Sequence, residues 1–142
     1  MESDKAAILI KKAALEFDKI SNAVLDAYGL TTAQYKVMKY LYDEAENGVR
    51  LVDLEKYYSV SHPTAIGIVQ NLEKKGLVTY RENPHHARSR FLVPTEAAMA
   101  QKAELIAVGE TLESALTQKL SEPERQELVG LLKKMMGMSE AV

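Results

Sequence analysis

The chain has no cysteine among its 142 residues. This absence excludes disulfide bonds, thiolate catalysis, thiol-based redox sensing and every zinc site that uses cysteine. No apolar run approaches the roughly 20 residues of a membrane-spanning helix, so we expect no transmembrane segment. The first residues include acidic side chains and no small-residue cleavage site, which argues against a secretory signal and favours a cytoplasmic protein.

The signatures of common enzymes are also missing. Glycine-rich phosphate loops, HExxH pairs and nucleophile elbows do not occur. His85 and His86 are neighbours in a loop, and adjacent residues rarely chelate one ion, while zinc needs three or four ligands. We therefore expect no catalytic residue, no metal site and no cofactor. A separate hypothesis is that these histidines, near phosphates, gain protons and tighten DNA binding as the pH falls towards about 6.

The composition that is present, 46% apolar and 27% charged residues, predicts one globular domain over residues 1–142. The net charge is −2, yet residues 62–94 carry five lysines and arginines against two glutamates. The basic surplus therefore lies in one stretch, as expected if only that stretch approaches phosphates. Chance scatter in a short window is the alternative.

That stretch has the pattern of a helix followed by a hairpin. Apolar residues recur at i, i+3, i+4 and i+7, which predicts one buried helix stripe of Ala65, Ile68, Val69 and Leu72. Gly76 ends the helix, residues 77–81 have a strand pattern, the pair Asn83-Pro84 opens a turn, and residues 88–93 return as the partner strand. A helix with one free face beside a basic hairpin predicts a winged helix-turn-helix.

Further helices surround this unit. We expect them at residues 4–27, from 31 or 32 to about 47, a brief one at 52–58, a long one from 95 to about 119, and a last one from Ser121, whose SEPE start is a capping box. The predicted fold class is mainly α with a small β-hairpin wing (α+β).

The first helix and the last two carry apolar stripes that a winged-helix body cannot cover alone. A two-fold homodimer of interlocked terminal helices would bury them. We therefore assign residues 31–93 to a winged-helix DNA-binding lobe and residues 4–28 and 95–138 to dimerisation helices. In such a dimer, two recognition helices enter successive major grooves of a palindromic site.

Several segments resemble the MarR family of transcriptional regulators: LTTAQYKVMKYL, LVDLEKYYSVS, SHPTAIGIVQNLEKKGLV and the HHARSR wing before Thr95. The resemblance implies obligate dimers that bind palindromic operators, usually as repressors, and that often release DNA when a small aromatic ligand binds. Two departures matter. The family's wing sequence Asp-Arg-Arg is replaced by His86, Ala87 and Arg88, and Gly67 stands where a long polar side chain is common.

With the apolar stripe inward, the other helix positions face the groove. Gln70 can pair with adenine and Ile66 can contact a thymine methyl, whereas small hydroxyls and lysines suit phosphates. The expected DNA-binding residues are Ser61, His62, Thr64, Ile66, Gln70, Lys74, Lys75, Arg88 and Arg90. An ordinary solvated helix face is the alternative for the polar ones.

The two wing arginines are expected on one side of a strand, with Ser89 between them. Arg88 is the expected minor-groove contact, where a narrow A·T-rich tract attracts guanidinium. Arg90 serves either as a second contact or as an ion-pair partner of Glu82.

An effector site is expected in a crevice beside the second helix, lined by Tyr28, Tyr35, Met38 and Tyr42, which would suit an aromatic acid. The alternative is that the tyrosine rings pack in the core with their hydroxyls at the surface.

The function predicted from the sequence is a homodimeric repressor of double-stranded operator DNA, with a small aromatic effector and no membrane partner. The competing hypothesis keeps the dimer but uses the helix as a protein-interaction surface. Gly67 and the missing wing arginine favour that alternative.

Overall fold

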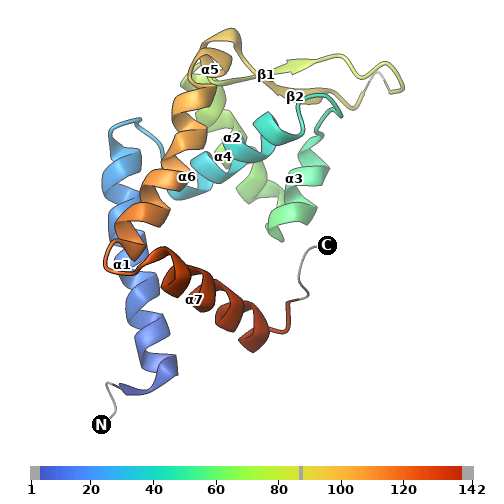
Figure 1. Cartoon of the computed structure of the whole chain (residues 1–142). Helices are drawn as coiled ribbons and strands as arrows, with labels where there is room; N and C mark the ends of the chain where they lie inside the picture. Colours follow the sequence, from blue (N-terminus) through green and yellow to red (C-terminus); the bar gives the residue numbers. More distant parts are fainter. Residues whose placement is uncertain (1–3, 87, 139–142) are drawn as a thin grey trace. The chain divides into compact units, whose positions relative to one another are not determined.

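The computed structural model describes residues 4–86 and 88–138, which form seven helices and one antiparallel hairpin (Figure 1). The elements are α1 Ala6–Asp26, α2 Thr32–Asp43, α3 Leu51–Tyr58, α4 His62–Lys74, β1 Val78–Arg81, β2 Phe91–Pro94, α5 Glu96–Ala100, α6 Lys102–Thr117 and α7 Glu122–Met135. The predicted fold class, mainly α with a small hairpin, is confirmed. The chain divides into two compact units: Ser21–Gly109, and the segments on either side of it.

The core of the Ser21–Gly109 unit forms where α2, α4 and the hairpin meet. Met38 and Leu41 of α2 and Leu72 of α4 have no exposed surface, and Leu92 of β2 is 1% exposed. Val49 forms an isolated bridge to Leu92, which ties the α2–α3 connection to the hairpin. The inward stripe predicted for α4 is buried at three of its four positions, since Ile68 is half-buried.

The helix starts follow the predicted capping chemistry. At the start of α2, the Gln34 N–H donates to the Thr31 Oγ1 and the Thr31 N–H donates to the Gln34 Oε1, both at 3.1 Å. The Thr95 hydroxyl caps α5 by accepting from the Ala98 N–H. These bonds satisfy amides that a helix start leaves without intrahelical partners.

The prediction of one long helix over residues 95–119 is wrong, because the chain forms two helices, α5 and α6, that are separated at Gln101. The Ala98 carbonyl accepts the Tyr42 hydroxyl at 2.6 Å and the Gln101 N–H at 3.1 Å. The second bond spans three residues instead of four, so the α-helical ladder breaks between α5 and α6. The helix expected to reach about residue 47 also ends early, at Asp43, before a turn in which Asn47 donates to Glu44.

The hairpin strands are shorter than predicted. Arg81 pairs with Phe91, so Arg88 and Arg90 precede β2 rather than lying along it. The Asn83 side chain accepts the His85 N–H at 2.9 Å, and the Asn83 carbonyl accepts the His86 N–H. These local bonds compete with the strand ladder and widen the tip into a loop.

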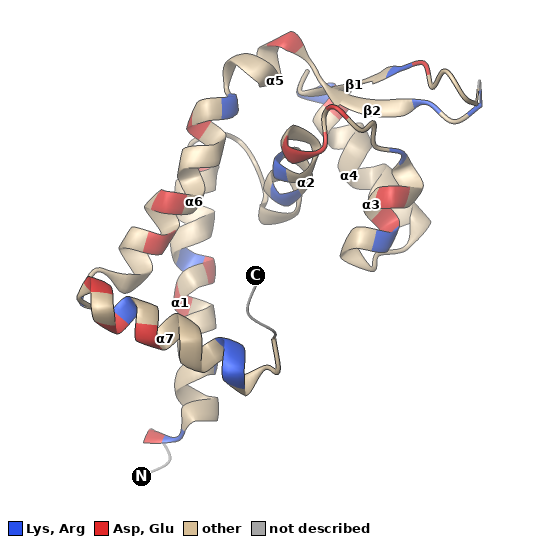
Figure 2. Cartoon of the chain, turned by 45° about the vertical axis from the view of Figure 1, so that its right-hand side comes forward, with Lys and Arg blue, Asp and Glu red and all other residues tan. Residues whose placement is uncertain are grey.

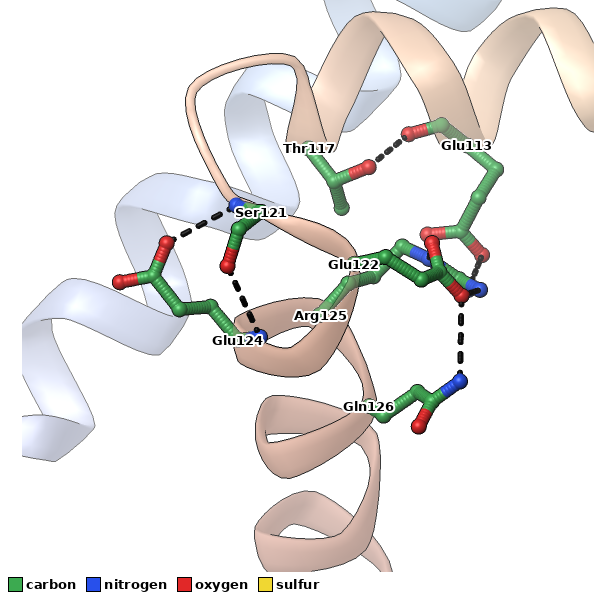
Figure 3. Close-up of polar contacts among 7 residues, drawn as sticks. All are labelled: Glu113, Thr117, Ser121, Glu122, Glu124, Arg125 and Gln126. Atoms are coloured by element: carbon green, nitrogen blue, oxygen red, sulfur yellow. Dashed lines mark hydrogen bonds and ion pairs between the residues drawn. The ribbon is translucent and has the colours of Figure 1, made fainter.

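In the other unit, α7 begins with a reciprocal capping box between Ser121 and Glu124 (Figure 3). Arg125 pairs with Glu122 in the same turn and reaches Glu113 on α6 at 4.0 Å. No residue of α7 is buried, and Leu131 and Met135 are 58% and 57% exposed. An amphipathic helix with an uncovered apolar face is unusual for a monomer.

Candidate nucleic-acid interface

The turn between α3 and α4 fixes the start of the predicted recognition helix. Ser59 ends α3 with φ +52°, a left-handed conformation that is uncommon for a side chain larger than glycine. The Ser61 Oγ accepts the Thr64 N–H at 3.3 Å and donates to the Thr64 Oγ1 at 2.9 Å. The two hydroxyls expected at phosphates therefore bond to each other, at an exposed helix N-terminus.

His62, the first residue of α4, has an acidic neighbour that the sequence did not indicate. Its Nδ1 lies 2.9 Å from the Glu55 Oε2 of α3, while 61% of its side chain is exposed. The carboxylate orients the ring and partly offsets the positive potential at this helix end. His62 thus lies on the predicted DNA face, held by α3.

The outer face of α4 is open. Gln70 and Lys74 are exposed, whereas Ile66 is half-buried and so less available than expected. A methyl group added at Gly67 would meet no atom within 4 Å, so this position leaves free space on the helix.

Lys75 differs from its neighbour Lys74. Its ammonium donates to the Gln34 Oε1 at 2.7 Å and to the Gly29 carbonyl. It joins the C-terminal end of α4 to the α1–α2 turn. The ammonium that was expected at a phosphate is thus engaged within the protein.

The wing presents its arginines in two different settings. The Arg90 guanidinium lies 4.2 Å from the centre of the Tyr80 ring, a cation–π contact. The alternative expected for Arg90, an ion pair with Glu82, does not occur among residues 4–86 and 88–138. Arg88 is exposed, and Ala87 lies outside the described residues.

A groove of about 460 Å³ connects the wing with α3 and the start of α4. Its lining includes Arg88, Arg90, Tyr80, His62, Glu55 and Arg50. Figure 2 shows basic residues on both arms of the wing and mixed charges on α3. The groove brings together three arginines that are distant in sequence, which creates a concave, mainly positive surface.

Sequence reasoning missed Arg50. It precedes α3, and its backbone N–H and guanidinium both bond the Asp53 carboxylate, with a closest distance of 2.8 Å. Burial disfavours the ionised form of Asp53, but these bonds outweigh it and lower the pKa of the carboxyl. An acid three residues after the residue that precedes a helix is a capping signal that could have revealed this arrangement.

The residues expected to line an effector crevice are mostly core residues. Met38 is fully buried, and the buried Tyr42 hydroxyl donates to the Ala98 carbonyl. Tyr35 is 8% exposed, and burial raises its pKa, as it does for Tyr42. Tyr28 remains 37% exposed. The Tyr42 ring packs in the core, as the alternative to an effector crevice predicted, but its hydroxyl is buried and does not reach the surface.

Two negative findings concern the described residues. Among them, no group of three histidine or acidic side chains is placed to hold a metal ion. No helix in the same part of the chain has both the length and the apolar character required to cross a membrane.

A sequence model described as the MarR family matches residues 28–89. The solved structure of the reduced form of MarR from E. coli is 29% identical to this chain, with a TM-score of 0.76, and the match covers 92% of this chain and 96% of the E. coli chain. Residues 28–89 thus match the MarR family, and the fold of the chain is that of MarR-family winged-helix regulators. Its neighbours with solved structures are transcriptional regulators. A search of curated proteins finds no match.

Two other MarR-like structures are similar in fold. The S. aureus MepR–DNA complex is 22% identical with a TM-score of 0.78, covering 94% of this chain and 97% of MepR. BpsR of Bordetella bronchiseptica, whose DNA binding is regulated by 6-hydroxynicotinic acid, is 24% identical with a TM-score of 0.76, covering 96% of each chain. The chain thus spans nearly the full length of these structures.

Proposed function

We propose that this protein is a sequence-specific regulator that binds double-stranded DNA as a homodimer, represses transcription at a palindromic operator and is released by a small ligand. The observation that carries the proposal is the arginine-lined groove between the wing and α3, beside the exposed face of α4. Positive charge gathered in one concave surface suits a phosphate backbone. The MepR relative supports it by having been solved with DNA.

The groove divides the recognition work between two elements. The N-terminal turn of α4, with Ser61, His62 and Thr64, approaches the major groove, and Gln70 reads a base. Arg88 extends from the wing to the minor groove, whereas Arg90, packed on Tyr80, contacts phosphate from a fixed position. Free space at Gly67 gives few direct base contacts, so DNA shape contributes to specificity.

The apolar surface outside the winged-helix unit supports a dimer. Large apolar side chains are exposed on α1 and α7, including Leu9, Leu15, Leu128, Leu131 and Met135. A two-fold interface that covers these faces repeats the recognition helix about a dyad. Half-sites about 34–36 Å apart then follow from the geometry of B-DNA.

Release by a ligand needs only modest coupling. A tenfold loss of DNA affinity corresponds to about 1.4 kcal/mol of differential binding between two states of the dimer. The effector class that we propose is a small aromatic molecule, supported by the regulation of BpsR by 6-hydroxynicotinic acid. The crevice residues Tyr28, Tyr35, Met38 and Tyr42 remain the predicted site for it.

The test is a fluorescence-anisotropy titration of the protein against the intergenic DNA beside its own gene, at several salt concentrations. Replacement of Arg88 by alanine should weaken binding by about 1–3 kcal/mol and flatten the salt dependence. Lys39→Ala, which removes a charge from α2 outside the groove, serves as the matched control. Equal binding by wild type and Arg88→Ala at every salt concentration would overturn the role of the wing.

The second candidate function is a dimeric protein-interaction module that does not bind an operator. Gly67 favours it, because the open space on α4 would also accept a partner side chain. Absence of salt-sensitive, sequence-dependent DNA binding at low salt would favour this function over the repressor.

A further inference from the structure

The Glu55 carboxylate lines the arginine-rich groove, where a negative charge opposes the approach of phosphates. Only 21% of its side chain is exposed. In the part of the chain that the structure describes, its one ion-pair contact is with His62, and it pairs with none of the three arginines of the groove. The carboxylate therefore needs a role other than neutralising an arginine, and its contact with His62 indicates which.

The backbone holds both members of this pair in place. The Glu55 carbonyl accepts the N–H of Ser59, which ends α3, and the N–H of Val60 at 3.1 Å. His62 follows Ser61, whose hydroxyl caps the start of α4. The turn between the two helices thus brings together side chains that are seven positions apart in the sequence. Neither residue can move far without opening a helix end.

The contact sets which nitrogen of His62 carries a proton. An ionised carboxylate only accepts hydrogen bonds, so the Nδ1 atom that lies 2.9 Å from the Glu55 Oε2 is the donor. In a neutral imidazole one nitrogen donates and the other accepts, so Nε2 is left with a lone pair. Because 61% of the His62 side chain is exposed, the ring can offer this acceptor to a partner outside the protein.

We propose that His62 determines sequence specificity by accepting a hydrogen bond from an exocyclic amino group in the major groove, and that Glu55 is the positioning residue that leaves Nε2 free to accept it. This inference rests on the proposed function, because it requires the start of α4 to enter the major groove. Adenine and cytosine present an amino group there, whereas guanine and thymine present a carbonyl oxygen. A lone pair that faces a carbonyl oxygen leaves two acceptors without a donor, so those bases are rejected.

This base pattern separates His62 from the other side chains expected at DNA. Gln70 both donates and accepts, so it favours adenine alone through two bonds. Arg88 and Lys74 only donate, so they favour guanine or phosphate. A position at which adenine and cytosine are accepted alike, on one strand of each half-site, is therefore the signature of a single acceptor such as Nε2.

The tautomer can be tested without DNA. Long-range proton–nitrogen NMR of the isotope-labelled full-length protein distinguishes a protonated ring nitrogen from a bare one at about pH 8.5, well above the ordinary imidazole pKa of about 6.5. His62→Ala identifies the His62 signals by their loss. We expect the proton on Nδ1 in wild type, and mainly on Nε2, as in free histidine, in Glu55→Ala.

The matched control is Glu46→Ala, which removes an exposed carboxylate outside the groove lining and should keep the wild-type tautomer. A wild-type ring that carries its proton on Nε2 would overturn the proposal. The same tautomer in wild type and Glu55→Ala would overturn the positioning role of the carboxylate.

The base preference is measured by selection from random double-stranded DNA, which requires no known operator. Wild-type sites should contain one position per half-site at which adenine and cytosine together exceed guanine and thymine about fivefold. His62→Ala should lose this preference and keep those at the other positions. Glu55→Ala should lose it as well, because the ring then donates from Nε2, whereas Glu46→Ala should retain it. An undiminished preference in His62→Ala or Glu55→Ala would contradict the proposal.

A modified base tests the amino group itself. In a selected site with adenine at that position, replacement by unsubstituted purine, which lacks the amino group, should weaken wild-type binding about fivefold and leave His62→Ala unaffected. Equal losses in both proteins would refute the contact. If selection enriches no sequence, the proposed function fails and the base contact with it, while the NMR result still decides whether Glu55 sets the tautomer of His62.

Discussion

Two adjacent lysines at the end of α4 offer the sharpest test of the structure. Lys74 is exposed, whereas the Lys75 ammonium is bonded to Gln34 and to the Gly29 carbonyl. The substitutions Lys74→Gln and Lys75→Gln remove the same charge from neighbouring positions. They should nevertheless affect different properties of the protein.

The magnitudes follow from these contacts. A hydrogen bond to a charged group contributes about 1.5–3 kcal/mol when it is shielded from water. Because Lys75 is exposed, we expect its two bonds together to contribute only about 1–2 kcal/mol, and this loss should appear in the free energy of unfolding. With a urea dependence of about 2 kcal/mol per M, the midpoint for Lys75→Gln should fall by about 0.5–1 M. Lys74→Gln should leave the midpoint nearly unchanged.

DNA binding should respond in the opposite way. Each phosphate contact contributes about 0.9 to the slope of log K against log salt, so loss of Lys74 from both subunits should reduce the slope by about 1.8. Lys75→Gln should keep the wild-type slope, even if affinity falls because α4 is less firmly held. Urea unfolding and anisotropy at four salt concentrations measure both quantities. A Lys75→Gln protein with a reduced slope and an unshifted midpoint would refute the reasoning and make Lys75 a phosphate contact.

Three further predictions concern stability, each measured by urea unfolding. Tyr42→Phe should destabilise by about 1–3 kcal/mol because it leaves a buried carbonyl of α5 without its hydroxyl partner. Tyr35→Phe should cost less, since the Tyr35 hydroxyl makes no hydrogen bond of ordinary length among the described residues and only a weak contact with the Gly109 backbone; equal losses would contradict this. Gly67→Ala should stabilise the protein by about 1 kcal/mol, since its methyl enters open space. Gly48→Ala should destabilise it, because Gly48 has φ +78° and the added methyl would lie 2.7 Å from the Phe91 ring. Because the pKa of Asp53 is lowered in the folded protein, its ionised carboxylate stabilises the fold above the pKa of the unfolded carboxyl, and this stabilisation is lost as the pH falls through the folded pKa. Asp53→Asn should therefore be less stable than wild type at pH 7 and approach it below about pH 4. A stability difference that stays constant across that range would count against it.

Local chemistry determined most of the secondary structure. The caps at Thr31, Ser61 and Ser121 are formed by side chains within three residues of the amides they satisfy, so the sequence alone places those helix starts. The break at Gln101 has no such local signal. The Ala98 carbonyl beside it accepts the Tyr42 hydroxyl, which lies 56 residues away in the chain, and such a distant partner cannot be read from periodicity.

The same distinction between local and long-range causes applies to the candidate interface. The sequence by itself determined the winged-helix pattern, the buried stripe of α4 and the concentration of positive charge near the wing, because these depend on spacing and residue type. Only the tertiary structure decided which charges are available. It paired His62 with Glu55, placed Arg90 on Tyr80, bonded Lys75 to Gln34 and brought Arg50 to the groove. Such pairings depend on where separate elements meet in space, and no short-range pattern specifies that.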